Sequence, residues 1–339
     1  MKKIAIEEHF FTESYLDYLR SREEHPRLES AEDENHNRVE HMWRSPVHYT
    51  VQTPQGISAL LDIGPGRLVE MDRVGINIQV LSMASPGVDE LDVPAGTTMA
   101  SKTNDELAQA IQENPERFAG FAAIAPGDPT TAAQELERAI RKLGLKGAKI
   151  NSNGRGEYLD DKKYWALFEK AEELGAPIYI HPKEPPQDML KFMATYPFLT
   201  GAGWGYGAEA GLHAMRLICS GLFDAYPRLK IILGHMGEAI PFWLWRIDNI
   251  WQTSPLKKKL KKNPGDYFKD NFWVTTSGMF SVEAFLCTYL TLGADRIIFA
   301  VDYPYESHDP AIRFMETVPI CNSDKEKIYH LNAEELLGL

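Results

Sequence analysis

The stretch KIAIEEHF, residues 3–10, ends an apolar run with three polar side chains. Glu and His are poor turn formers, so the end of a strand is an unusual place for them. Side chains on a strand alternate between its two faces, so Glu7 and His9 point to one side and Glu8 points to the other. The sequence therefore predicts that Glu7 and His9 share a partner, which the rest of the chain must supply.

Eight short apolar runs recur along the chain, and most are followed by a helix-like stretch. They lie at 2–8, 76–83, 118–126, 145–151, 176–182, 229–237, 271–278 and 296–304. These runs are apolar on both faces, which is typical of parallel strands that are covered on both sides. Helical patterns separate them at 99–114, 130–143, 162–174, 209–220, 238–250, 281–292 and 309–317.

This alternation predicts an α/β fold, a (β/α)8 TIM barrel with extra helices near 323–330 and 332–337. A doubly wound open sheet is the alternative, but no GxGxxG turn follows the first run. Residues 11–66 and 183–208 are much longer than ordinary connections. Both follow the carboxyl end of a predicted strand, so we expect them to form lids after strands 1 and 5. We expect residues 1–339 to form one domain.

Composition restricts the function and the compartment. The chain has 339 residues, of which 44% are hydrophobic and 25% charged, as in ordinary globular proteins. A net charge of −12 argues against nucleic acid or an acidic membrane as the main partner. Three widely spaced cysteines indicate a reducing compartment without disulfides. Because no secretory signal or membrane-spanning run is present, we expect a cytoplasmic protein.

Polar residues recur at the ends of the predicted strands. His181 ends the fifth, His235 the sixth and Asp302 the eighth, in addition to Glu7 and His9 on the first. Taken singly, a histidine at the end of a strand is more often a structural residue than a metal ligand, and an aspartate before Tyr-Pro can simply cap a turn. Taken together, they would bury several charges without a common partner, which costs several kcal/mol each. Two carboxylates and two imidazoles, from Glu7, His9, His181 and Asp302, suit Zn²⁺ or Mn²⁺ with positions open for substrate.

Four stretches carry a family resemblance: EEHF (7–10), YIHP (179–182), GHMGEAIPFWLWRID (234–248) and DYPYE (302–306). They resemble the amidohydrolase superfamily, and in it the non-oxidative decarboxylases of γ-resorcylate, 2,3-dihydroxybenzoate and 5-carboxyvanillate. The resemblance covers nearly the whole chain, and GHMGE followed by WRID is its most specific part. The ExH pair stands where the hydrolases have HxH, which favours a decarboxylase.

The resemblance also implies roles for individual residues. Glu7, His9, His181 and Asp302 would bind the metal. His235 would stand over the substrate and Glu238 would orient it. Arg246 would bind a substrate carboxylate or pair with an acid such as Asp248, and Tyr305 would contact a ring substituent or pack at the rim. Arg44 and His48 lie in the first long loop, which places them within reach of the site. A homodimer or homotetramer is implied as well.

The chemistry of a benzoate indicates how its CO₂ must leave. Direct loss would leave an electron pair in the ring plane, where no π system stabilises it. Protonating the carboxylate-bearing carbon first avoids this, and an ortho hydroxyl makes that carbon electron-rich. We therefore expect a carboxy-lyase in which a metal chelates the substrate, Asp302 donates the proton, and His235 and Glu238 assist. No organic cofactor is needed, because the ring accepts the electrons.

Two other functions compete with this one. A metal-dependent hydrolase of a lactone or amide would use the same cavity with a metal-bound hydroxide. A metal-storage or purely structural barrel would have a closed site without an adjoining pocket. Release of CO₂, as opposed to ring opening, separates the first two. Carboxylate ligands favour Mn²⁺ slightly over Zn²⁺. The aromatic acid itself is left open.

Overall fold

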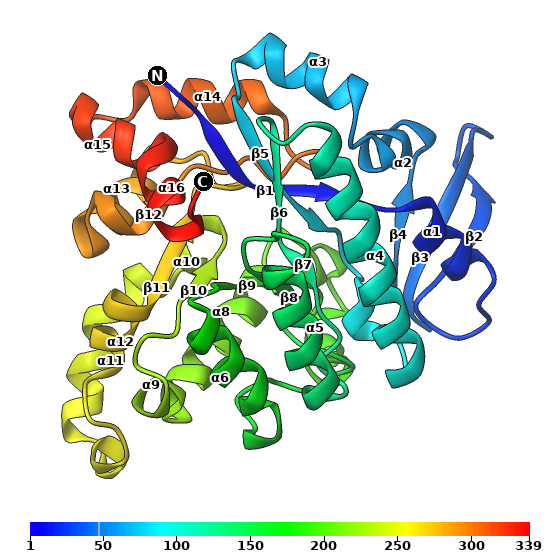
Figure 1. Ribbon diagram of the computed structural model, residues 1–339. Coiled ribbons are helices and arrows are strands. Elements are labelled where there is room, and N and C mark those ends of the chain that lie inside the picture. The colour runs from blue at the N-terminus through cyan, green and yellow to red at the C-terminus, as the bar shows by residue number, and fades with distance from the viewer. Residues whose placement is uncertain (47) are drawn as a thin grey trace.

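Parallel strands lie at the centre of the molecule, among the helices (Figure 1), in a computed structural model that describes residues 1–46 and 48–339. One sheet has the order β1 (Ile4–Phe10), β5 (Ile78–Met83), β6 (Phe118–Gly120). The other has the order β12 (Ile297–Ile298), β11 (Phe272–Thr275), β10 (Ile231–Leu233), β9 (Ile178–His181), β8 (Ala148–Asn151), β7 (Ala122–Ala123). Each strand falls within one of the eight predicted apolar runs or extends it by two residues.

The two sheets join at both seams. Only Phe121 separates β6 from β7, and its backbone N–H donates to the carbonyl of Leu81 at 2.9 Å. Three backbone hydrogen bonds close the other seam. They run from Ile6 N to Phe299 O (3.2 Å), from Asp302 N to Glu7 O (2.9 Å) and from His9 N to Tyr303 O (2.7 Å). The strands therefore form a closed barrel. The predicted (β/α)8 fold is confirmed, and the open doubly wound sheet is wrong.

Helices surround the barrel where the periodicity predicts them. The outer helices are α4 (Val93–Glu113), α5 (Pro129–Arg141), α6 (Trp165–Leu174), α8 (Gly205–Cys219), α11 (Ile240–Thr253), α13 (Val282–Leu292) and α14 (His308–Thr317). Asp128 caps α5 by accepting bonds from Thr130 N and Thr131 N. Gly175 ends α6 in the left-handed conformation, as its place in the sequence predicts.

The first long segment contains more regular structure than a lid loop. It folds into α1 (Glu13–Arg20), an antiparallel sheet of β2 (Arg27–Glu32), β3 (Arg38–Ser45) and β4 (His48–Gln52), and then α2 (Pro54–Leu61). Its last two residues begin α3 (Pro65–Val74), which leads back to the barrel. Figure 1 shows this small sheet beside the barrel (blue, right). The buried residues of β3 are Val39, Met42 and Ser45, a spacing of three. Because strands are recognised by alternation, this pattern gives no strand signal.

The second long segment and the C-terminus are helical. The segment contains α7 (Gln187–Met193) and a 3₁₀ turn, Pro197–Thr200. Shorter helices are α9 (Leu222–Ala225), α10 (His235–Glu238) and α12 (Pro264–Asn271). The chain ends in α15 (Asn322–Glu326), a π-helical turn (Lys327–Leu331) and α16 (Asn332–Leu337). Ala333 and Leu336 of α16 pack against Ile4 and Ile6 inside the barrel, so α16 closes its amino-terminal end. Within the described residues, no helix combines the length and apolarity needed to cross a bilayer.

Candidate metal centre and active site

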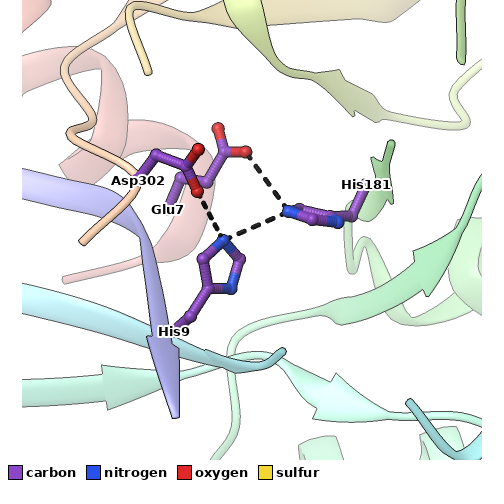
Figure 2. Close-up of side chains that lie close together, drawn as sticks. All are labelled: Glu7, His9, His181 and Asp302. Atoms are coloured by element: carbon purple, nitrogen blue, oxygen red, sulfur yellow. Dashed lines mark hydrogen bonds and ion pairs between the residues drawn. The ribbon is translucent and has the colours of Figure 1, made fainter. Parts of the chain in front are cut away.

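Four side chains meet at the carboxyl end of the barrel (Figure 2). Glu7 and His9 come from β1, His181 ends β9, and Asp302 follows β12. One ligand atom from each lies within 4.8 Å of the others. Glu7, His9 and His181 are buried, and Asp302 is partly exposed. The structure thus brings together the four residues that the sequence predicts to be metal ligands.

The atoms that face one another are suited to a shared cation. His9 Nε2 lies 3.1 Å from His181 Nε2 and 2.9 Å from Asp302 Oδ1, and His181 Nε2 lies 3.7 Å from Glu7 Oε1. Within the described chain, Glu7 Oε1 and Asp302 Oδ1 are buried and receive no well-directed hydrogen bond. Such oxygens are costly unless a cation or donor compensates them. This nitrogen and oxygen set fits one divalent metal ion.

Hydroxyl groups hold the opposite sides of Glu7 and His9 in position. Glu7 Oε2 accepts a bond of 2.8 Å from Thr275 Oγ1 and a short one from Ser277 Oγ, both from the end of β11. Ser82 Oγ lies 3.2 Å from His9 Nδ1. These contacts leave Glu7 Oε1 and His9 Nε2 facing the centre. The sequence analysis did not identify these three hydroxyl residues, because their only signal is that small polar residues stand at the ends of two strands.

Glu8 points away from this centre. Its Oε1 accepts from Val301 N at 3.1 Å, and its Oε2 accepts from Gln79 Nε2 at 3.2 Å. His308 Nε2 lies 3.7 Å from the same carboxylate, and all these side chains are buried. The expected alternation of Glu7, Glu8 and His9 is therefore confirmed. The Glu8 carboxylate forms its hydrogen bonds on the face of β1 opposite to the four-residue cluster.

His235 and Glu238 form a pair beside Asp302. His235 Nδ1 lies 2.9 Å from Glu238 Oε1, and His235 Nε2 lies 3.7 Å from Asp302 Oδ2. All five residues from His235 to Ala239 have positive φ, between 48° and 81°, and φ of Asp302 is 81°. A left-handed conformation costs a residue other than glycine about 1–2 kcal/mol. Backbone strain of this kind concentrates at functional sites.

The charges around His235 and Asp302 place a proton on the imidazole. Burial disfavours the imidazolium, but Glu238, Glu7 and Asp302 outweigh burial and raise the pKa of His235 well above its usual value. Burial alone would raise the pKa of Asp302, but His235 and His9 outweigh it and lower that pKa. From protein groups alone, His235 holds a proton and Asp302 is ionised.

Tyr305 and Arg44 lie near the cluster. The Tyr305 ring centroid is 5.6 Å from that of His9, and its side chain is half-exposed. Arg44 comes from β3, and its side chain is only 7% exposed; it donates to Glu184 Oε2 at 3.1 Å and to the Ser85 carbonyl at 3.2 Å. Its Nε is buried without a partner in the described structure. The first insertion therefore reaches the region of the site.

His48 also comes from the first insertion. Its Nε2 is buried without a partner among the described residues, and burial lowers its pKa.

Arg246 and Asp248 are placed differently from the other predicted residues. Arg246 is exposed on α11, and among the described residues no side chain forms an ion pair or hydrogen bond with it. Asp248 Oδ1 accepts a bond of 2.8 Å from Gly265 N, which ties α11 to α12. The single chain therefore does not join Arg246 to the four-residue cluster, and Asp248 is not its partner.

Comparisons with known proteins agree with this geometry. The family model described as amidohydrolase matches residues 41–339. The γ-resorcylate decarboxylase of Polaromonas sp. strain JS666 is 38% identical, over 99% of this chain and 98% of its own length. That of Rhizobium radiobacter is 41% identical, over 83% of this chain and 88% of its own length.

Solved structures of similar proteins cover the whole chain. The 5-carboxyvanillate decarboxylase of Sphingomonas paucimobilis has a TM-score of 0.88 and 37% identity, covering 100% of this chain and 99% of that one. A Polaromonas dihydroxybenzoic acid decarboxylase with bound manganese and 2-nitroresorcinol has a TM-score of 0.86 and 37% identity, covering 100% and 97%. The chain therefore belongs to the amidohydrolase family, in the branch that contains the aromatic acid decarboxylases.

Proposed function

We propose that this protein is a metal-dependent, non-oxidative decarboxylase that converts an ortho-hydroxy aromatic acid to a phenol and CO₂. The observation that carries the proposal is the cluster of Glu7, His9, His181 and Asp302, with the His235–Glu238 pair beside it. The cluster can hold a cation that binds the substrate, and the pair can supply a proton. Relatives of nearly the same length carry decarboxylase names. A lactone or amide hydrolase has no comparable support.

A dihydroxybenzoate is the first substrate to test. The γ-resorcylate decarboxylases are up to 41% identical to this chain, and γ-resorcylate is 2,6-dihydroxybenzoate. A 5-carboxyvanillate is the second, because the structural relative from Sphingomonas acts on it. Both acids carry a hydroxyl ortho to the carboxylate, so both meet the electronic requirement for protonation of the ring carbon.

We propose Mn²⁺ as the resident metal, held by Glu7, His9, His181 and Asp302. Two carboxylate oxygens and two imidazole nitrogens suit Mn²⁺, and related structures contain manganese. Bound there, the ion would act as a Lewis acid and orient the substrate's oxygens. Zn²⁺ is the alternative to compare in the same assay.

The proton path follows from the positions of three residues. Asp302 delivers a proton to the ring carbon that bears the carboxylate, and that carbon becomes tetrahedral. The bond between that ring carbon and the carboxylate carbon then breaks, and CO₂ leaves. The electron pair of the broken bond stays with the ring and restores its aromaticity. His235, 3.7 Å from Asp302, supplies the proton that Asp302 passes on, and Glu238 holds the imidazole in position. The low pKa of Asp302 makes His235 the store of the proton.

Two further residues complete the proposed substrate site. The half-exposed Tyr305, beside His9, would contact a ring substituent. Arg246 would bind the substrate carboxylate, although it is exposed on α11 in the single chain. Phe242 and Trp245 on the same helix are 72% and 75% exposed, which supports packing of a second copy against this helix in a homodimer or homotetramer. Three unpaired cysteines support a cytoplasmic location.

The experiment is a CO₂-release assay on protein stripped of metal and then reloaded with Mn²⁺ or Zn²⁺. The substrates are 2,6-dihydroxybenzoate, 2,3-dihydroxybenzoate and 5-carboxyvanillate, with a lactone and an amide as hydrolase substrates. We expect CO₂ from at least one acid only after metal is restored, and no ring opening of the lactone. Asp302→Asn should abolish turnover, whereas Asp188→Asn, at an exposed ion pair with Lys191, should not. Near-normal turnover by Asp302→Asn with metal bound would exclude Asp302 as the donor.

A further inference from the structure

We propose that Asn151, acting through Ser85, keeps the proton of His181 on Nδ1 and so leaves Nε2 free to bind the metal. Asn151 ends β8 and is buried, and Ser85 follows β5. Both are positioning residues, since neither faces the four-residue centre. The inference rests on the proposed role of His181 as a metal ligand.

The orientation of the Asn151 amide is fixed by its partners. Asn151 Nδ2 donates to the carbonyl of Pro86 at 2.7 Å and to Asp89 Oδ1 at 2.8 Å, and both of these atoms accept. Asn151 Oδ1 receives a bond of 2.8 Å from Lys149 Nζ, an ammonium that can only donate. Exchanging nitrogen and oxygen would place donors against donors and acceptors against acceptors. The carbonyl oxygen of Asn151 therefore faces Ser85.

The orientation of the amide determines the direction of the next hydrogen bond. Ser85 Oγ lies 2.7 Å from Asn151 Oδ1 and 3.3 Å from His181 Nδ1. A hydroxyl has one hydrogen, and the carbonyl of Asn151 takes it. Toward His181, Ser85 can only accept, so Nδ1 must carry the proton. A neutral imidazole has a single N–H, and a metal-binding imidazole is neutral.

The other ring nitrogen of His181 is thereby left with its lone pair. His181 Nε2 points into the cluster, 3.1 Å from His9 Nε2 and 3.7 Å from Glu7 Oε1. The opposite tautomer would place a hydrogen at the position where the metal must bind. The chain from Asn151 through Ser85 thus sets the ring in its ligating form before the metal arrives, which saves the reorganisation that binding would otherwise require.

The second histidine of the centre supplies a matched control. Ser82 Oγ lies 3.2 Å from His9 Nδ1, but no other described residue forms a side-chain hydrogen bond with Ser82. Its hydroxyl is free to donate or to accept, so it does not dictate the tautomer of His9. Ser82→Ala should therefore leave the tautomer of His181 unchanged, which separates the proposed effect from the general effect of removing a buried hydroxyl.

The test reads the tautomer directly in metal-free protein. Protonated and unprotonated ring nitrogens differ widely in ¹⁵N chemical shift, and the His181 signals are identified by their loss in His181→Gln. We expect Nδ1–H in the wild type and in Ser85→Thr, which keeps a hydroxyl. We expect a mixture of His181 tautomers in Ser85→Ala, which has no hydroxyl facing Nδ1. We expect a mixture in Asn151→Ala as well, because its Ser85 hydroxyl has lost the carbonyl that orients it. Mn²⁺ affinity, measured by chelator competition, should fall about 10- to 100-fold in Ser85→Ala and recover in Ser85→Thr.

Two results would overturn the inference. One is Nε2–H in the wild type, and the other is an unchanged tautomer and Mn²⁺ affinity in Ser85→Ala. Should Asn151→Ala fail to fold, the Ser85 variants decide the question alone. The tautomer is read without turnover, so protein with the expected tautomer and no CO₂ release would refute the proposed function and leave the inference intact. Active enzyme with the wrong tautomer would refute only the inference.

Discussion

Replacing Ser277 by alanine removes one of two hydroxyls that hold Glu7, and we expect it to weaken Mn²⁺ binding. Glu7 Oε2 accepts from Thr275 and Ser277, and Glu7 is fully buried. A hydrogen bond to a charged group contributes about 1.5–3 kcal/mol. Each 1.4 kcal/mol changes an affinity about tenfold, so the loss should be about 10- to 100-fold.

The physical reason lies in the state of the Glu7 carboxylate. Burial raises the pKa of Glu7, and the Ser277 hydroxyl is among the groups that oppose this rise. Without that hydroxyl, the ionised and correctly turned carboxylate is less favoured, and the metal must restore it on binding. The assay is competition for Mn²⁺ with a chelator, followed at constant pH.

Thr276→Val is the matched control for this prediction. Thr276 directly precedes Ser277, but its hydroxyl bonds to the backbone of Ala300 and not to Glu7. Thr276 Oγ1 donates to Ala300 O at 2.8 Å and accepts from Ala300 N at 3.0 Å. Its loss should lower the free energy of unfolding, because two buried backbone groups lose their partner, without changing Mn²⁺ affinity. Equal Mn²⁺ affinities for wild type and Ser277→Ala would refute the reasoning.

Three further predictions concern stability. Gly237→Ala should lower the free energy of unfolding in urea by about 1–2 kcal/mol more than Gly144→Ala does. Both glycines have positive φ, but a Cβ added at Gly237 would lie 3.0 Å from Val274 Cγ1, whereas a Cβ added at Gly144 would have nothing within 4 Å. Equal losses of stability would contradict this prediction. Burial lowers the pKa of Lys149 to about 8, so the unfolded chain binds the Lys149 proton more tightly than the folded protein does. The free energy of unfolding of the wild type, relative to that of Lys149→Met, should therefore rise by up to about 3 kcal/mol between about pH 8 and pH 10.5. A difference that does not change with pH would show that Lys149 titrates normally. Mn²⁺ at 100 times its Kd should stabilise metal-free protein by about 2.7 kcal/mol in thermal unfolding, and the same concentration should have little effect on His181→Gln.

The barrel was predictable because its signals are local. Strands covered on both faces are apolar throughout, and the helices between them begin and end at recognisable residues such as Asp128 and Gly175. The convergence of Glu7, His181 and Asp302 followed from the rule that carboxyl ends of parallel strands meet. The small antiparallel sheet of the first insertion was not predictable, because β3 buries every third residue.

The contacts that position the centre were also beyond the sequence. Ser85, Asn151 and Ser277 are small polar residues of ordinary kind, and each acquires its role from a partner on another strand. Distances between strands are not encoded in any local pattern. Arg246 shows the reverse case, since its motif predicts a substrate contact while α11 exposes it in the single chain.

The central claim is that one divalent ion binds among Glu7, His9, His181 and Asp302 and holds the aromatic acid. Anomalous X-ray scattering at the manganese edge, from crystals grown with Mn²⁺ and 2,6-dihydroxybenzoate, tests it most directly. We predict a single anomalous peak bounded by these four side chains, with the acid beside it and within reach of His235. A peak elsewhere, or none at this position in manganese-loaded active protein, would contradict the claim.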